Sequence, residues 1–179
     1  TLESVLITGN GDLSDTCVAT VEVFGTSTFV NVTLAENHDE YGLRSVKDAN
    51  EVAALTTTNS IVWNNGSTNV STEGTFEAHA TVVKGGGVVT SGEIWGSDLE
   101  EAPYYSDFVP KLGWQTEAGR RVVDTGNNGY VTVTTDAKGN PRVENGIVDL
   151  GAVEYQTPYE GATPSLLVTT LADVVDPMD

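Results

Sequence analysis

Short runs of alternating hydrophobic and polar residues fill the first half of the chain, which is the pattern of β-strands. Such runs occur at 4–10, 19–25 and 28–37, and each is rich in β-branched residues and ends at Gly or Asn. The stretch 39–55 instead suits a short helix or a long loop. The stretch 92–114 loses the alternation and mixes acids with large aromatic residues, which indicates an extended loop packed by its aromatics. The pattern therefore predicts a protein built mostly of β-strands.

A weak internal repeat links three of the segments. They read VLITGN at 5–10, VTLAEN at 32–37 and SIVWNN at 60–65, and a shorter relative follows at 80–86. Their last residues, 27 and 28 positions apart, are Asn10, Asn37 and Asn65. This period suits coils of a β-solenoid, each of which lays a short strand beside the previous one.

Stacked coils would place equivalent side chains in columns. We expect Ile7, Leu34 and Val62 to form one inward column, because they occupy the same place in the three repeats. The three asparagines should meet at one corner, where their side-chain amides can stack as a ladder.

The segment 136–155 organises the rest of the chain. It begins with a turn, Asp136-Ala137-Lys138-Gly139-Asn140-Pro141, and continues into two short apolar runs. Its pattern, Asp-x-x-Gly-x-Pro-Arg and then Val-Asp-aliphatic-Gly-Ala-x-Glu, resembles the closing segment of bacterial surface proteins of the adhesin-like, polymorphic outer-membrane-protein type. Two further pieces, NSIVWNN at 59–65 and DTGNN at 124–128, are similar to coil and pre-closing elements of that family.

This resemblance implies a right-handed, single-stranded parallel β-helix, an all-β fold. It implies that residues 1–156 form the β-helix domain and that the coils precede the closing segment. Residues 157–165 read as a Pro- and Gly-bearing linker. Residues 166–179 are similar to the opening strand of a new β-helix, so they form an extended strand that either starts a further domain or is donated to a neighbour.

Charge excludes several partners. The chain has 26 acidic and 8 basic residues and a net charge of -18. Duplex nucleic acid and anionic membrane surfaces need a basic face, so neither is an expected partner. No apolar run is long enough to predict membrane insertion. The acids can form a solvated coat, a salt adaptation or Ca²⁺ sites, and the candidate ligands are Asp12, Asp15, Asp136, Asp173 and Asp176.

Signals for catalysis are missing from the sequence. There is no Gly-x-Ser-x-Gly elbow and no glycine-rich phosphate loop, and His38 and His79 lack metal-ligand spacing. Cys17 is the only cysteine and sits among aliphatic residues, so a buried thiol is the expectation. We expect neither an enzyme nor a cofactor other than Ca²⁺. The alternative is a carbohydrate-binding or lyase-like β-helix, in which surface polysaccharide would stack on a platform of Trp95, Tyr104, Tyr105 and Trp114.

The two ends of the chain suggest an assembly. Residues 1–7 read as a strand without a capping element, so the first coil should expose an unpaired edge. The tail offers a detached apolar strand formed by Leu166, Leu167, Val168, Thr169, Thr170 and Leu171. Strand addition between the two would join copies head-to-tail into a filament or surface array. The resemblance implies an extracellular, cell-surface structural module, and the two ends predict that it binds copies of itself or neighbouring domains of a longer chain.

Overall fold

The computed structural model describes residues 1–11, 18–48, 52–86 and 89–157. It is nearly all β, with parallel sheets, which confirms the predicted fold class at that level. The strands are β1 (Leu2–Glu3), β2 (Leu6–Thr8), β3 (Ala19–Phe24), β4 (Thr26–Val30), β5 (Thr33–Ala35), β6 (Tyr41–Val46), β7 (Ala54–Trp63), β8 (Thr68–Thr72), β9 (Thr75–Lys84) and β10 (Ser91–Ser97).

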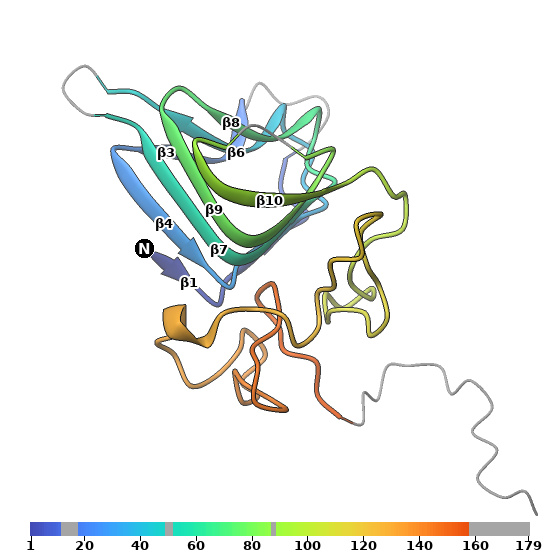
Figure 1. Cartoon of the computed structure of the whole chain (residues 1–179). Helices are drawn as coiled ribbons and strands as arrows, with labels where there is room; N and C mark the ends of the chain where they lie inside the picture. Colours follow the sequence, from blue (N-terminus) through green and yellow to red (C-terminus); the bar gives the residue numbers. More distant parts are fainter. Residues whose placement is uncertain (12–17, 49–51, 87–88, 158–179) are drawn as a thin grey trace, which may run out of the picture.

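Two sheets are formed within the described residues. The large sheet has the order β1-β4-β7-β5-β2, with β9 added to β7 and β10 added to β9. The long strand β7 pairs with both β4 and β5, because these two strands run in line and only a bend separates them. The small sheet has the order β3-β6-β8. In Figure 1 the small sheet lies over one face of the large sheet, and the segment after β10 lies below the other face.

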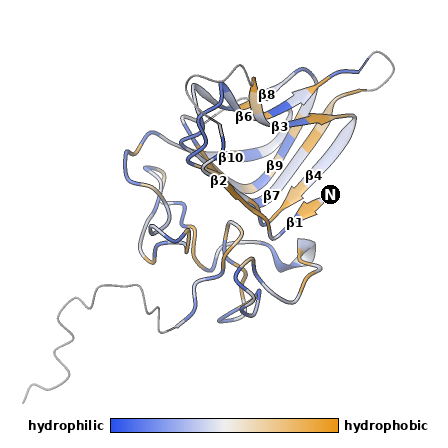
Figure 2. Ribbon diagram, turned by 180° about the vertical axis from the view of Figure 1, so that it is seen from behind, coloured by the Kyte–Doolittle hydropathy of each residue, from blue (hydrophilic) through white to orange (hydrophobic). Residues whose placement is uncertain are grey.

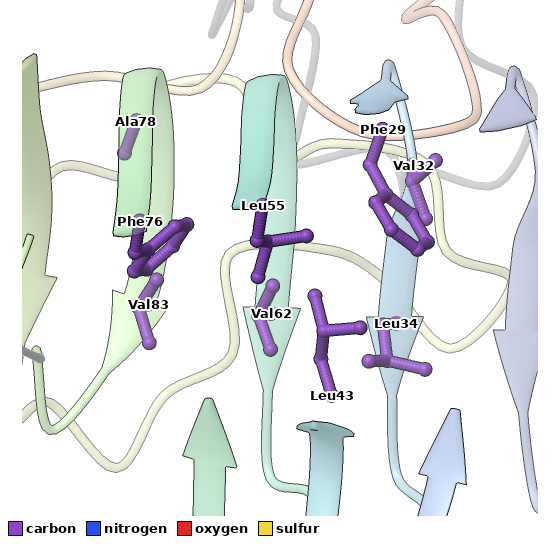
Figure 3. Packing of buried hydrophobic residues seen from close by; sticks show 9 residues of the cluster. All are labelled: Phe29, Val32, Leu34, Leu43, Leu55, Val62, Phe76, Ala78 and Val83. Atoms are coloured by element: carbon purple, nitrogen blue, oxygen red, sulfur yellow. The ribbon is translucent and has the colours of Figure 1, made fainter. Parts of the chain in front are cut away.

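Each passage of the chain through the large sheet, here called a coil, pairs with the next. Ile7 is in register with Leu34, and Leu34 is in register with Val62. The predicted inward column is therefore confirmed. Figure 3 shows Leu34 and Val62 from the large sheet pointing toward Leu43 of β6. The core between the sheets consists of Phe29, Val32, Leu34, Leu43, Leu55, Val62, Phe76, Ala78 and Val83.

The predicted asparagine ladder is also present. The Nδ2 of Asn10 donates to the Oδ1 of Asn37 over 3.0 Å, and the Nδ2 of Asn37 donates to the Oδ1 of Asn65 over 2.7 Å. The ladder continues to Asn69, whose Oδ1 accepts from the Nδ2 of Asn65 at 3.1 Å and whose Nδ2 donates to the carbonyl of Lys84. In each pair of side chains the earlier asparagine donates to the Oδ1 of the later one, so the ladder has a direction.

Two columns of left-handed backbone mark the bends of the coils. One column follows the paired ends of β1, β4 and the first half of β7, and its members with positive φ are Ser4, Asn31, Asn59 and Ala80. The second follows β2, β5, β7 and β9, and its members are Gly9, Glu36, Asn64 and Gly85. Left-handed backbone is costly for most residues and cheapest for Gly, Asn and Asp. The repeat predicted the corner asparagines, but it did not reveal these bends.

Three expectations for the chain's organisation were wrong. The stretch 39–55 contains β6 and the start of β7, because Leu43 pairs with Val21 and Val70 and points into the core. Part of the expected loop 92–114 is strand β10, which pairs with β9. The described parallel strands end at Ser97, so the coils do not extend to residue 136. Residues 98–157 carry only a 3-10 turn, Asn128–Tyr130, and three isolated antiparallel bridges among the described residues.

The segment 98–157 covers the outer face of the large sheet. Trp63 of β7 meets Trp114 edge to face, with 5.6 Å between ring centroids. Ile61 and Leu150 belong to the same buried cluster. At Gly151 a Cβ would lie 2.5 Å from the Oγ1 of Thr33 and 3.0 Å from Ile61, and its φ is +90°, so only glycine fits this close approach. The segment is therefore part of the same packed body as the coils.

Replacing Leu34 by Ala should lower the free energy of unfolding by about 2–5 kcal/mol, because the change removes buried methyl groups and leaves a cavity in the column. Leu34 is 1% exposed. The matched control is Leu112→Ala, since Leu112 is 61% exposed and its loss should cost at most about 0.5 kcal/mol. Urea denaturation of both variants tests this, and equal costs would contradict the assigned core.

Candidate functional site

The first coil presents an edge of each sheet, here called the open edge and formed by β1, β2 and β3. Within the described residues each of these strands pairs on one side only. Leu2 is 37% exposed, whereas Phe29, its partner one coil later, is 3% exposed. The inward residues of the first coil, Val5, Ile7, Val21 and Val23, are only partly buried. The open edge therefore combines backbone that pairs on one side only with partly buried apolar residues, and β1 and β2 are coloured hydrophobic in Figure 2.

The asparagine ladder ends at this edge. Asn10 is exposed, while Asn37 and Asn65 are fully buried. Asn37 also accepts from the backbone N–H of Asn10 at 3.0 Å, and its Nδ2 reaches the carbonyls of Ile7 and Ala35. Because each side-chain pair runs from the earlier asparagine to the later one, an asparagine in register on a strand added before β2 would donate to the Oδ1 of Asn10.

The closing segment lies beside the open edge and fixes it. Leu6 of β2 packs against Val109, Ala152 and Val153. The carboxylate of Glu3 accepts from the backbone N–H of Thr132 at 2.7 Å and from its hydroxyl. Contacts on the outer side therefore hold β1 and β2 in place, although each pairs with one strand only among the described residues.

A buried ion cluster holds the closing segment together. The Nη2 of Arg142 lies 3.0 Å from the Oε2 of Glu154, with side-chain exposures of 1% and 0%. The same nitrogen donates to the carbonyl of Asp149 at 3.1 Å. The carboxylate of Asp149 accepts from the backbone N–H groups of Asp124 and Tyr155 at 2.7 and 2.6 Å. Arg142, Asp149 and Glu154 are motif residues, and here they cross-link the two halves of the segment.

The cluster also joins the closing segment to the bends of the coils. The Nδ2 of Asn31 donates to the carbonyl of Asp149 at 2.9 Å. The side chain of Asn59 accepts from the N–H of Asn127 and donates to its carbonyl. Two members of the left-handed column are therefore hydrogen-bonded to the segment that covers the sheet, which explains the side-chain type at these positions.

Burial shifts the pKa values of the charged groups in this cluster. It raises the pKa of Glu154 to about 8, and the nearby charge of Asp149 adds to the rise. It raises the pKa of Asp149 to about 6, although the N–H groups of Asp124 and Tyr155 favour the carboxylate. It lowers the pKa of Arg142, against the attraction of Glu154 and Asp149. Desolvation is the first cause in each case.

Of the five predicted metal ligands, the structure describes only Asp136. Asp136 is 5% exposed, and its carboxylate accepts from the backbone N–H groups of Lys138, Asn140 and Glu154. It therefore shapes the turn of the closing segment. Asp12, Asp15, Asp173 and Asp176 lie outside the described residues, as does Cys17. Among the described residues no group of three His, Cys, Asp or Glu side chains is arranged to hold a metal ion.

The predicted sugar platform is corrected by the structure. Tyr104 and Trp114 are buried, because the hydroxyl of Tyr104 donates to Glu36 at 2.6 Å and the indole of Trp114 donates to the carbonyl of Glu101 at 2.9 Å. Trp95 and Tyr105 are partly exposed, but a cationic side chain lies over each ring. Arg120 is 5.3 Å from the ring centroid of Trp95, and Lys111 is 5.9 Å from that of Tyr105. The four rings therefore do not form one exposed face.

A polar groove runs along the corner that carries the ladder. Its volume is about 630 Å³, and its lining includes Asn64, Ser67, Asn69, Lys84, Asp98 and Glu100. The ammonium of Lys84 lies 3.3 Å from the carboxylate of Glu100 and 5.7 Å from the ring centroid of Trp63. Sequence reasoning missed this groove, because its residues come from separate coils.

Comparisons with known proteins give no relative. No protein-family model matches the chain, and neither a curated protein nor a solved structure matches it. In the part of the chain that the structure describes, no helix has the length and hydrophobicity needed to cross a membrane. The proposed assembly strand, Leu166–Leu171, lies outside the described residues.

Arg142→Met should lower the free energy of unfolding by about 3–5 kcal/mol, because the change leaves the buried carboxylate of Asp149 without its counter-charge and Glu154 without its donor. The matched control is Arg120→Met, since its ion pair with Glu93 is about half exposed and is worth at most about 1 kcal/mol. Chemical denaturation at pH 7 checks both. Equal, small losses would show that the cluster does not stabilise the closing segment.

The raised pKa values of Glu154 and Asp149 predict that their contribution to stability falls as pH rises. Between the unfolded pKa values, near 4, and the folded values of about 6 and 8, the folded state binds more protons than the unfolded state. The difference in unfolding free energy between the wild type and Glu154→Gln should thus decrease from pH 5 to 8, by at most about 1.4 kcal/mol per pH unit. A difference that grows with pH would mean that Arg142 keeps Glu154 ionised.

Proposed function

We propose that this protein is an extracellular, structural or adhesive module with a right-handed parallel β-helix, which assembles head-to-tail through strand addition at the open edge. One observation carries the proposal: the first coil is half-exposed and its strands pair on one side only. An edge of this kind is a template for a further parallel strand.

Three features support the β-helix. Successive coils pair in parallel, with Ile7, Leu34 and Val62 in one column. An asparagine ladder runs along one corner, and two columns of left-handed residues mark the bends. The closing segment resembles that of surface β-helix proteins, and its motif residues Arg142, Asp149 and Glu154 form one buried cluster.

The tail supplies a fitting partner for the open edge. Leu166–Leu171 contains only apolar residues and threonine, and it follows the Pro- and Gly-bearing segment 157–165. Its side chains suit the inward column of an apolar cross-section. Contact between the tail of one copy and the edge of another is heterologous, so repetition gives a filament or a surface array rather than a closed dimer.

Charge sets a condition on this assembly. A chain with a net charge of -18 repels its copies, and 0.1 M salt screens this repulsion between charges more than about 10 Å apart. Assembly should therefore be favoured by salt. This dependence distinguishes apolar strand addition from contacts between opposite charges, which salt weakens.

The groove at the ladder corner favours a second candidate function, the binding of a surface polysaccharide. Amides, hydroxyls, two carboxylates and Lys84 line it, and these groups recognise sugar hydroxyls. The platform of four aromatic residues no longer supports this candidate, since Tyr104 and Trp114 are buried. Binding of acidic and neutral polysaccharides to the wild type and to Lys84→Ala separates this function from a purely structural one.

Deleting residues 161–179 should convert the assembly to monomers, because the donated strand is lost. Leu171→Pro should do the same without a change in net charge, since proline removes a backbone donor from the strand. The control Asp179→Pro alters the same tail outside the proposed strand and should still assemble. Light scattering and sedimentation at high salt give the particle mass of each variant.

Two results would contradict head-to-tail assembly. One is a monodisperse monomer of the intact chain at every salt concentration, which would favour a tail that begins the next domain of a longer chain. The other is an assembly of wild-type size after the deletion of residues 161–179, which would place the contact elsewhere.

A further inference from the structure

We infer that the tail occupies the open edge in one register, with Thr170, Leu171 and Ala172 lying over Leu6, Ile7 and Thr8. The inference rests on the proposed function, since it takes the tail to be the partner of the open edge. It goes further by identifying which residues pair and by limiting the added strand to β2.

The sequence Thr170-Leu171-Ala172-Asp173 nearly repeats that of β5 and its following residue, Thr33-Leu34-Ala35-Glu36. In β5 these residues have separate roles. Leu34 points into the core, and Ala35 points outward into the cluster around Trp63. Strand β5 already pairs with β2, in the register Leu6–Thr33, Ile7–Leu34 and Thr8–Ala35. A strand with nearly the same sequence can therefore pair with the other side of β2 in the same register.

The bend after β2 supports this register. Its column of left-handed residues comprises Gly9, Glu36, Asn64 and Gly85. The proposed register continues the column with Asp173, and Asp tolerates left-handed backbone better than most residues.

The bend before β2 limits the length of the added strand. Its column includes Ser4, Asn31 and Asn59, all with positive φ. The register would continue this column with Val168, and a β-branched residue is strongly disfavoured there. The added strand therefore begins after Val168, covers β2, and does not continue along β1.

The ladder gives a third check on the register. Val174 falls at the position of Asn10, and valine has no amide, so the natural tail ends the ladder. In Val174→Asn a new side-chain Nδ2 would donate to Asn10, as Asn10 donates to Asn37 over 3.0 Å. A single substitution in the tail should then strengthen docking.

The described chain leads toward this edge. Tyr155, two residues before the end of the described part, belongs to the same cluster as Leu6 of β2. From residue 157 to residue 170 the chain can span roughly 40 Å when extended. The tail is therefore long enough to reach the edge of its own chain or that of a neighbour, and exchange between the two is domain swapping.

Disulfide trapping tests the register. In a full-length chain with Cys17→Ala, Thr8→Cys is combined with Ala172→Cys, which would lie directly beside it on the outward side. The matched controls pair Thr8→Cys with Thr170→Cys or Val174→Cys, two residues away on the same side. Adjacent strands bring directly opposite Cα atoms to about 5 Å, whereas the shifted pairs lie about 8 Å apart, beyond disulfide reach.

Rapid cross-linking of the 8–172 pair, with little from the controls, is the expected result. Cross-links between chains support both the register and the filament. A cross-link within one chain supports the register and overturns the filament, because the tail then caps its own edge. Faster cross-linking of a control pair, or none in any pair, overturns the register even where an assembly forms.

Val174→Asn provides a second measurement that does not depend on cysteine chemistry. One added neutral hydrogen bond should lower the concentration needed for assembly, or for tail docking in the same chain, by roughly fivefold. Val174→Ala is the control, since it removes the valine without adding a donor. Equal values for Val174→Asn and Val174→Ala would contradict the proposed register.

Discussion

The asparagine ladder constrains every coil of this structure. Asn37 is buried, and its single amide group joins three successive coils through Asn10, the carbonyls of Ile7 and Ala35, and Asn65. A buried amide that lost these partners would cost more than the bonds contribute, so a shift of one residue in any coil is strongly disfavoured. The apolar column Ile7–Leu34–Val62 fills the interior once the ladder and the bends have fixed the register.

A stack held in this way has a consequence at its first coil. Each strand pairs with the corresponding strand of the following coil. Among the described residues, the backbone on the other side of the first coil therefore has no strand partner. The segment 98–157 stabilises the outer side of this coil through its contacts with Leu6 and Glu3, and none of its described residues forms a strand beside β1 or β2. The strand pairing and the asparagine ladder that fix the register of the coils therefore also determine which strand could pair with the first coil.

The coils could be predicted because their sequences repeat. The other parts of the fold depend on contacts between residues far apart in the sequence, so the sequence alone did not reveal them. The recurring Asn10, Asn37 and Asn65 disclosed the register, because each makes the same contact one coil later. The sequence did not reveal strand β6, because Gly42 and Arg44 interrupt the alternation of hydrophobic and polar residues that is typical of a strand. Arg44 faces Glu22 on the surface, and Gly42 leaves room for Asn65.

The aromatic residues were misread because exposure depends on what packs against them. Trp114 and Tyr104 lie in a segment without regular structure, and such a segment normally suggests a surface loop. Here it covers the outer face of the large sheet and buries both rings against Trp63 and Glu36. In the closing segment, the motif identified Arg142 and Glu154 but not their complete burial, which the partners in the coils produce.

Asn37→Ala, compared with Asn10→Ala, tests the dependence of the fold on the ladder most directly. Urea denaturation should show that Asn37→Ala lowers the free energy of unfolding by at least about 2 kcal/mol. The change leaves buried groups in two neighbouring coils without their hydrogen-bond partner. Asn10 is exposed at the end of the ladder, so Asn10→Ala should cost about 1 kcal/mol or less. Equal losses for the two variants would contradict the claim that the ladder fixes the register of the coils.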